Sequence, residues 1–168
     1  MTLLFIDSFD HYNVVGPTGL QTKWDTSTQG AGTLSTNTTV TRGGGNSMFS
    51  DTANSKNSFS LTVAETNELI TGGAFRFDIK SEDTAIVDFK KSGGSRGTVV
   101  RLDNGRIAVY RFQTLVASDD SNNFTLKPNT WYYIETYVKG GNAGIVDVRV
   151  NGKQRFYSSS DRDWETSV

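Results

Sequence analysis

The chain has 168 residues, a net charge of −1 and no cysteine. It is long enough for one domain with its own hydrophobic core, and it offers no disulfide, thiolate metal ligand or cysteine nucleophile. No segment concentrates Lys and Arg into a basic stripe, and no stretch approaches the roughly 20 apolar residues of a membrane-spanning helix, so we expect neither nucleic acid nor a membrane as a partner.

The first apolar segment, "LLFIDSFDHYN" at residues 3–13, contains the only histidine, His11. Leu4 and Ile6 fit the inward side of a strand, and Asp10 and His11 lie on its polar side, where the strand ends. A transition-metal site here needs a further strong ligand, and the chain has no second histidine. We therefore interpret the segment as the strand with which the domain begins.

The next segment, from Thr26 to Ser60, is rich in Thr, Ser, Asn and Gly. Its polarity is typical of disorder, but Leu34, Val40 and Met48 recur within it. We interpret it as short outer strands and loops packed on the domain, not as a linker.

Clearer strand patterns follow. "GAFRFDIK" at 73–80 alternates Phe75 and Phe77 with polar residues, as in a strand with one buried and one wet face, and "TAIVDFKK" at 84–91 predicts a further strand. In "TVVRLDNGRIAVYRF", at 98–112, an Asn-Gly pair lies between two apolar runs. Because Asn-Gly readily takes positive φ at both positions, this pair predicts a two-residue hairpin.

Two strands are predicted nearer the C-terminus. "NTWYYIETYVKG" at 129–140 is apolar on both faces, which predicts a central strand covered on both sides. "GIVDVRVNGKQRF" at 144–156 alternates inward valines with Asp147 and Arg149, then turns at a second Asn-Gly pair. No window shows helical periodicity. The repeated antiparallel strands predict an all-β chain, a two-sheet sandwich or a barrel, formed by one domain spanning 1–168.

Several motifs, in this order, resemble a known family. "NTWYYIETYVKGGNAGIVDVRVNGKQRF" is similar to the concanavalin A-like lectin/glucanase superfamily in its laminin-G-like form, which implies a jelly-roll sandwich. The opening "LLFIDSFDHYN", "KW" at 23–24 and "RGGGNSMF" at 42–49 resemble a group of such domains in tailed-bacteriophage virion proteins. Each motif alone is weak, and their order along most of the chain is the more specific feature.

This resemblance implies a non-enzymatic virion structural protein, either a capsid decoration or a tail-associated component. Its expected partners are other virion proteins and further copies of itself, its expected location is the virion, assembled in the host cytoplasm, and no cofactor is expected. Such domains usually have a further strand after the last hairpin, whereas this chain stops at "SSSDRDWETSV". Three alternatives stay open: the chain lacks its last strands, its tail closes the sheet, or a neighbouring subunit supplies the edge.

Glucanases of this superfamily present two acidic side chains on one strand face, about 5 to 5.5 Å apart in retaining enzymes. The acidic pairs of this chain are Glu65 with Glu68 and Glu82 with Asp83. Neither spacing places two carboxylates side by side on a strand face. We therefore expect no enzyme, and Glu82 and Glu135 are the best residues that a glycan-active enzyme would have.

Two kinds of binding site are considered as well. The loop "SDDSNN" at 118–123 offers Asp119, Asp120 and Asn122 as a weak calcium site, although such side chains more often cap their own backbone. The alternative function is a carbohydrate-binding adhesin or binding module that recognises a host surface glycan.

Aromatic faces commonly bind sugars in lectin-like sandwiches, and we name Tyr110, Tyr132 and Trp164 as candidates for such contacts. Most aromatic residues of a sandwich instead pack in its core.

Overall fold

A computed structural model describes residues 24–28, 34–37, 39–43, 47–50, 58–62, 66, 68–77, 84–90, 96–111, 114–118, 124–140 and 144–159. The chain forms two compact units, Met1–Glu65 and Thr66–Val168. The described residues contain strands, turns and loops, and no helix. The all-β class is therefore confirmed for this part of the chain, and the single domain spanning 1–168 stays a prediction.

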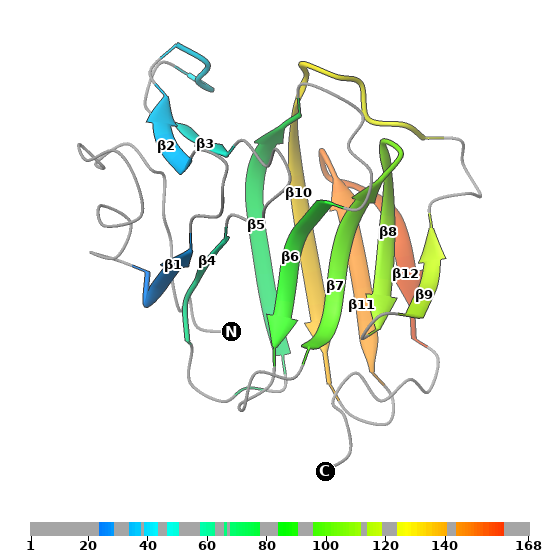
Figure 1. The fold of residues 1–168 in the computed structure, drawn as a ribbon. Helices are drawn as coiled ribbons and strands as arrows, with labels where there is room; N and C mark the ends of the chain where they lie inside the picture. Colours follow the sequence, from blue (N-terminus) through cyan, green and yellow to red (C-terminus); the bar gives the residue numbers. More distant parts are fainter. Residues whose placement is uncertain are drawn as a thin grey trace. The chain divides into compact units, whose positions relative to one another are not determined.

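In the described residues of the first unit, four short strands form two antiparallel pairs (Figure 1). These strands are β1 (Thr26–Thr28) with β4 (Ser58–Ser60), and β2 (Leu34–Asn37) with β3 (Ser47–Ser50). Their presence confirms that the polar segment holds short strands.

Local side-chain hydrogen bonds fix the ends of these strands. The Asn37 Oδ1 accepts hydrogen bonds from the backbone N–H groups of Thr39 and Val40, at 2.8 Å each, so that the chain turns as β2 ends. The Asp25 carboxylate, just before β1, accepts a hydrogen bond from the Thr62 N–H, beyond β4. This contact closes one end of the β1–β4 ladder.

The described residues of the second unit form two four-stranded antiparallel sheets (Figure 1). The first, called the β10 sheet, has the order β12-β11-β10-β5, with β5 (Glu68–Arg76), β10 (Trp131–Lys139), β11 (Ile145–Val150) and β12 (Lys153–Ser158). The second, called the β7 sheet, has the order β6-β7-β8-β9, with β6 (Thr84–Lys90), β7 (Arg96–Asp103), β8 (Arg106–Arg111) and β9 (Thr114–Ser118).

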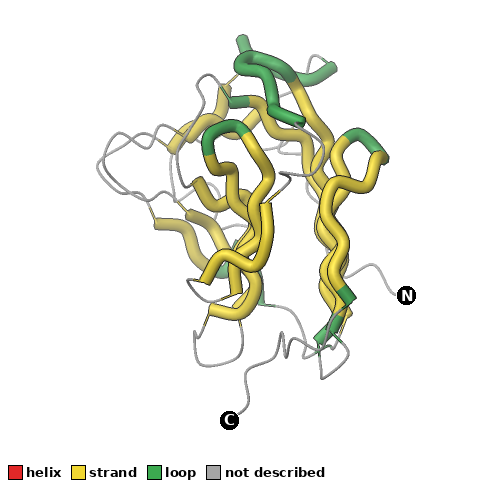
Figure 2. Tube along the Cα trace, turned by 90° about the vertical axis from the view of Figure 1, so that its right-hand side faces the viewer, coloured by secondary structure: helices red, strands yellow, loops and turns green. Residues whose placement is uncertain are grey.

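The two sheets pack face to face, and Figure 2 shows them as two separate layers of strands. Their inward side chains form one hydrophobic core, to which the β7 sheet contributes Val100, Leu102, Ile107 and Val109, and the β10 sheet contributes Tyr132, Ile134, Val146, Val148, Val150 and Phe156. Burial of this apolar surface is the main stabilising contribution. The arrangement is consistent with the predicted two-sheet sandwich.

Both predicted Asn-Gly hairpins are confirmed. Asn104 and Gly105 have φ values of 49° and 78° between β7 and β8, and Asn151 and Gly152 have 51° and 75° between β11 and β12. Positive φ at both central residues is the geometry of a type I′ turn, which matches the twist of the two strands.

The segment before β10 contacts the two sheets through hydrogen bonds and one pair of aromatic rings. The Leu126 N–H donates to the Gly105 carbonyl at 2.7 Å. The Lys127 N–H donates to the Tyr132 hydroxyl at 2.9 Å, and the Phe124 ring meets the Tyr132 ring edge-on, with centroids 6.3 Å apart. The Tyr132 ring is therefore buried in the core, while its hydroxyl oxygen accepts a hydrogen bond from the backbone.

Two expectations about individual strands are corrected. The strand predicted at 73–80 begins earlier, at Glu68, because Gly72 and Gly73 lie within β5 and do not end it. Phe75 and Phe77 pack against the core, as their alternation predicts. β10 is a central strand, as predicted, but Tyr133 on its outer face is 38% exposed, so that the strand is not covered on both sides.

Candidate functional site

The outer face of the β10 sheet is the most distinctive surface of the described residues, and the register of β10 defines it. Along this strand, Tyr132, Ile134 and Thr136 are buried. Since successive side chains of a strand point to opposite faces, the intervening residues point outward. These are Trp131, Tyr133, Glu135, Tyr137 and Lys139.

Each outward residue of β10 has a partner on β5, and small partners leave room for an aromatic ring. Glu135 lies opposite Gly72, and Tyr133 lies opposite Ala74. A Cβ added at Gly72 would lie 2.9 Å from the Tyr133 hydroxyl oxygen and 3.3 Å from its Cζ atom. The Tyr133 phenol therefore lies over the backbone of β5 at Gly72, with part of the side chain exposed.

A buried carboxylate lies on the same face, on β11. Asp147 is only 8% exposed, and its cross-strand neighbours are Tyr137 on β10 and Tyr157 on β12. Its Oδ2 atom accepts a hydrogen bond from the Arg149 Nε at 3.0 Å, with the Arg149 Nη2 also at 3.0 Å. Its Oδ1 atom accepts a hydrogen bond from the Gln154 Nε2 at 3.0 Å. The carboxylate is thus held rigidly between two tyrosine positions.

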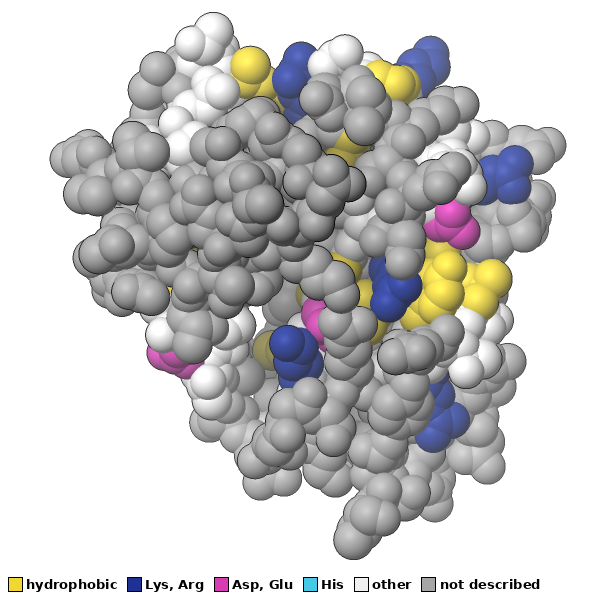
Figure 3. Space-filling model, in the orientation of Figure 1, with side chains coloured by type: hydrophobic (Ala, Val, Ile, Leu, Met, Phe, Trp, Pro, Cys, Tyr) yellow, Lys and Arg dark blue, Asp and Glu magenta, His cyan; other side chains and the backbone are white. Residues whose placement is uncertain are grey.

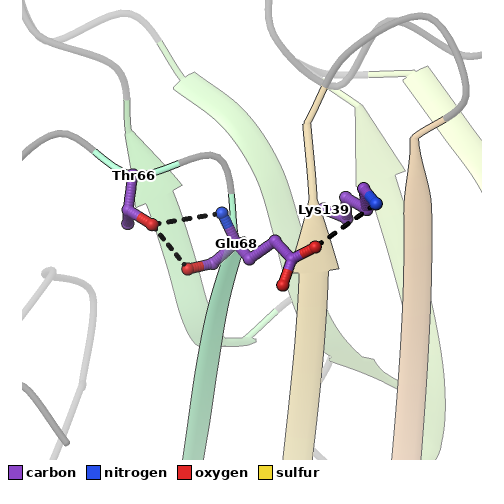
Figure 4. A network of polar contacts seen from close by, with 3 residues as sticks. All are labelled: Thr66, Glu68 and Lys139. Atoms are coloured by element: carbon purple, nitrogen blue, oxygen red, sulfur yellow. Dashed lines mark hydrogen bonds and ion pairs between the residues drawn. The ribbon is translucent and has the colours of Figure 1, made fainter. Parts of the chain in front are cut away.

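One end of the face carries an ion pair across two strands. Lys139 on β10 lies opposite Glu68 on β5, and the Lys139 Nζ is 3.3 Å from the Glu68 Oε1 (Figure 4). Thr66 fixes the start of β5, because its hydroxyl accepts from the Glu68 N–H at 3.2 Å and donates to the Glu68 carbonyl at 2.9 Å. Both charged side chains are nearly half exposed, so the pair contributes little to stability.

Exposed apolar side chains concentrate on this outer face. Among the described residues, four large hydrophobic side chains are well exposed, and three of them belong to this face, namely Ile70 at 48%, Tyr133 at 38% and Tyr157 at 52%. Ile70 lies opposite Tyr137, and Tyr137 lies opposite Asp147, so that Ile70, Tyr137, Asp147 and Tyr157 form one row across the four strands. We call the outward residues of the β10 sheet the tyrosine face.

The outer face of the β7 sheet has a different character. The Arg101 guanidinium lies over the Tyr110 ring, 4.5 Å from its centroid, in cation–π geometry. Leu115, opposite Tyr110 on β9, is 49% exposed. Figure 3 shows hydrophobic side chains with Lys or Arg side chains beside them over this part of the β7 sheet. Val99 and Ala108 on this face are fully buried. Accessible apolar surface therefore covers a smaller part of this face than of the outer face of the β10 sheet.

The two described candidates for sugar contacts lie in different parts of the second unit. Tyr132 is 7% exposed and belongs to the core. Tyr110 lies on the β7 sheet, with Arg101 over its ring. Trp164 lies outside the described residues, as do the calcium candidates Asp119, Asp120 and Asn122.

The segment with His11 and the acidic residues Glu65, Glu82 and Asp83 also lie outside the described residues. Glu68 and Glu135 are both on the tyrosine face, on β5 and β10. Among the described residues, no three His, Cys, Asp or Glu side chains group closely enough to hold a metal ion. No helix within the described ranges has the length and apolar composition to cross a membrane.

Sequence reasoning missed the cluster around Asp147. The spacing of Asp147 and Arg149 predicts two side chains on one strand face, which is where they lie. Tyr157 and Gln154 lie on β12, the strand after the second hairpin turn. Their places on the outer face are set by how β12 pairs with β11, and a bulge near Arg149 shifts that register. Because Lys153 pairs with the inward Val150, unbroken alternation through "KQRFYS" would place Tyr157 inward, so the local pattern carries no signal for Tyr157 on the outer face.

No match to this chain was found among protein-family models, curated proteins or solved structures.

Proposed function

We propose that this chain is a non-enzymatic bacteriophage virion structural protein, a capsid decoration or a tail-associated component, that acts through protein–protein contacts of the tyrosine face. The jelly-roll, concanavalin A-like topology and the virion location are part of the proposal. They are supported by the order of the motifs that end in the Trp131 strand and the Asn151–Gly152 hairpin.

The observation that carries the proposal is the concentration of exposed Ile70, Tyr133 and Tyr157 on one face. Clustered apolar side chains on a protein surface are typical of interaction sites, and tyrosine is enriched in protein interfaces. The Asp147 carboxylate, the buried charge of this face, already has its hydrogen-bond partners within the chain. A partner can therefore cover this carboxylate without leaving it unpaired.

The test is the protein composition of purified particles of the phage that encodes the chain. Quantitative mass spectrometry is expected to find the chain at a fixed copy number relative to the major capsid protein, retained after density-gradient purification. Absence from the particles, or a copy number that varies between preparations and falls with washing, would refute the virion assignment.

A second candidate function is carbohydrate binding, and the row around Asp147 favours it. Tyr137 and Tyr157 lie on either side of a carboxylate that Arg149 and Gln154 hold in place. Aromatic rings beside fixed polar groups are suited to a sugar ring, which has apolar C–H faces and hydroxyl edges. Binding on a glycan array, with and without calcium, that is lost in Tyr157→Ala would support this function, and an array without binding would exclude it.

A further inference from the structure

We infer that the tyrosine face binds a second copy of this chain, so that the protein self-associates through the outer face of the β10 sheet. This inference rests on the proposed function and names the partner of the same surface. It is argued from the charges, the exposed side chains and the size of the face.

The charges on the face balance one another. On β5, β10 and β11 the outward charged residues are three cations and three anions, namely Arg76, Lys139 and Arg149 against Glu68, Glu135 and Asp147. Two of the anions form an ion pair with a cation of the face, in the pairs Glu68–Lys139 and Asp147–Arg149. Glu135 lies directly opposite Arg149 in the register.

This balance favours a copy of the chain over a strongly charged partner. In a two-fold dimer the same surface lies on both subunits, so a face with a net charge would repel its own copy. The outward charges of β5, β10 and β11 have no such excess, and the whole chain has a net charge of only −1. On β12, Lys153 lies opposite the inward Val150, and the Arg155 guanidinium lies over the Phe124 ring. A basic or acidic partner would find no complementary excess on these three strands.

The exposed side chains are suited to such a contact. Ile70 and Tyr157 lie on β5 and β12, the two edge strands, and Tyr133 lies on β10 between them. The apolar residues therefore extend across the width of the sheet, and do not form one isolated spot. Tyrosine in particular supplies a large contact area at a low cost in conformational entropy.

The size of the face sets the expected strength of the contact. Its strands have nine, nine, six and six residues. With a strand spacing of about 4.8 Å and a rise of about 3.3 Å per residue, they cover about 500 Å² when flat. Two such faces make about 1,000 Å² together, near the lower limit for a specific interface. The isolated protein is therefore expected to form a weak dimer, which repeated contacts in a particle would strengthen.

The experiment measures the mass of the full chain by sedimentation velocity and light scattering, from about 1 μM to about 1 mM, the range of weak to moderate affinities. The wild-type chain is expected to change from monomer to dimer within this range. Ile70→Arg and Tyr157→Arg, on opposite edge strands, are each expected to raise the dimer dissociation constant about tenfold or more, because each places an unpaired charge in the contact.

Leu115→Arg is the matched control. Leu115 is 49% exposed and Ile70 is 48% exposed, but Leu115 lies on the β7 sheet. The control is expected to leave the dissociation constant unchanged within about twofold. Circular dichroism and thermal unfolding check that all three variants fold, and each substituted side chain is already well exposed in the wild-type chain.

A wild-type chain that stays monomeric up to about 1 mM would overturn the inference. It would also be overturned if Leu115→Arg weakened the dimer as much as Ile70→Arg, or if neither Ile70→Arg nor Tyr157→Arg weakened it. None of these results affects the particle composition, so the virion role would stand with a different protein on the tyrosine face. Conversely, a dimer that depends on Ile70 in a chain absent from particles would refute the virion role alone.

Discussion

The Tyr133 phenol lies over Gly72 on the neighbouring strand, where a Cβ atom at position 72 would be 2.9 Å from the hydroxyl oxygen. Glycine in a strand interior usually destabilises a sheet because it has no side chain to pack and loses more backbone entropy. Here the absent side chain leaves the space that the ring occupies. The shape of the tyrosine face therefore depends on a residue without a side chain.

This relationship predicts coupling between the two positions. In a Tyr133→Ser background, Gly72→Ala is expected to raise the unfolding free energy by about 0.5 to 1 kcal/mol, the usual gain for replacing a strand glycine. In the wild-type background most of this gain is expected to vanish, because the new methyl group displaces the phenol. Urea unfolding of the four proteins measures the coupling, and equal effects of Gly72→Ala in both backgrounds would contradict the described contact.

The register of the β10 sheet is tested by two isoleucines on opposite faces. Ile134 is 1% exposed in the core, and Ile70 is 48% exposed on the tyrosine face. Ile134→Ala is expected to lower the unfolding free energy by about 3 kcal/mol, since it removes buried methyl groups and leaves a cavity. Ile70→Ala is expected to cost less than about 1 kcal/mol. Comparable losses, measured by urea unfolding at a concentration where the chain is monomeric, would mean that the register is wrong.

A buried hydroxyl in the core predicts a stabilising substitution. Thr136 is 1% exposed, and its Oγ1 atom, like that of its cross-strand neighbour Thr71, has no hydrogen-bond partner in the described part of the chain. Thr136→Val keeps the shape and removes the unpaired polar atom, so it is expected to raise the unfolding free energy by about 1 kcal/mol. The exposed Thr114→Val serves as a control and should change it by less than about 0.5 kcal/mol. A clear loss of stability in Thr136→Val would show that the hydroxyl is hydrogen-bonded, for example to an internal water.

A pH dependence is predicted for the first unit. The hydrogen bonds from Thr62, first that of its backbone N–H and then that of its side chain, hold the pKa of the Asp25 carboxyl below its ordinary value of 3.8. A carboxyl with a lowered pKa in the folded state stabilises the fold above its unfolded pKa, and this contribution is lost as the pH falls through the folded pKa. The β1–β4 end is therefore expected to keep its contact down to a pH below 3.8.

The Thr62 amide resonance reports this titration in an NMR pH series. We expect a midpoint below 3.8 in the wild-type chain and no corresponding titration in Asp25→Asn. A midpoint at or above 3.8 would show that Thr62 does not stabilise the charged carboxylate.

Local features of the second unit were predictable from the sequence. The Asn104–Gly105 and Asn151–Gly152 turns follow from the positive φ that these residue pairs tolerate, and the inward Val146, Val148 and Val150 follow from a period of two. Both kinds of inference need only a few neighbouring residues. They therefore hold even without knowledge of which strands pair.

The remaining features depend on contacts between residues that are distant in the sequence. The glycines of β5 belong to a strand because β10 pairs with it and Tyr133 fills the space over Gly72. The strand β9 is short and partly exposed, and apolar and polar residues alternate too weakly along it for the strand to be identified from the sequence. The tyrosine face combines four strands, and neither the pairing of β5 with β10 nor the bulge between β11 and β12 can be derived from local periodicity.

A cryo-EM reconstruction of the particle tests most directly whether the tyrosine face is a contact surface within a virion. We expect density for the chain on the capsid or the tail, with Ile70, Tyr133 and Tyr157 buried against a neighbouring subunit. A reconstruction in which the chain is present and these three side chains all face solvent, or one in which the chain is absent from the particle, would contradict this expectation.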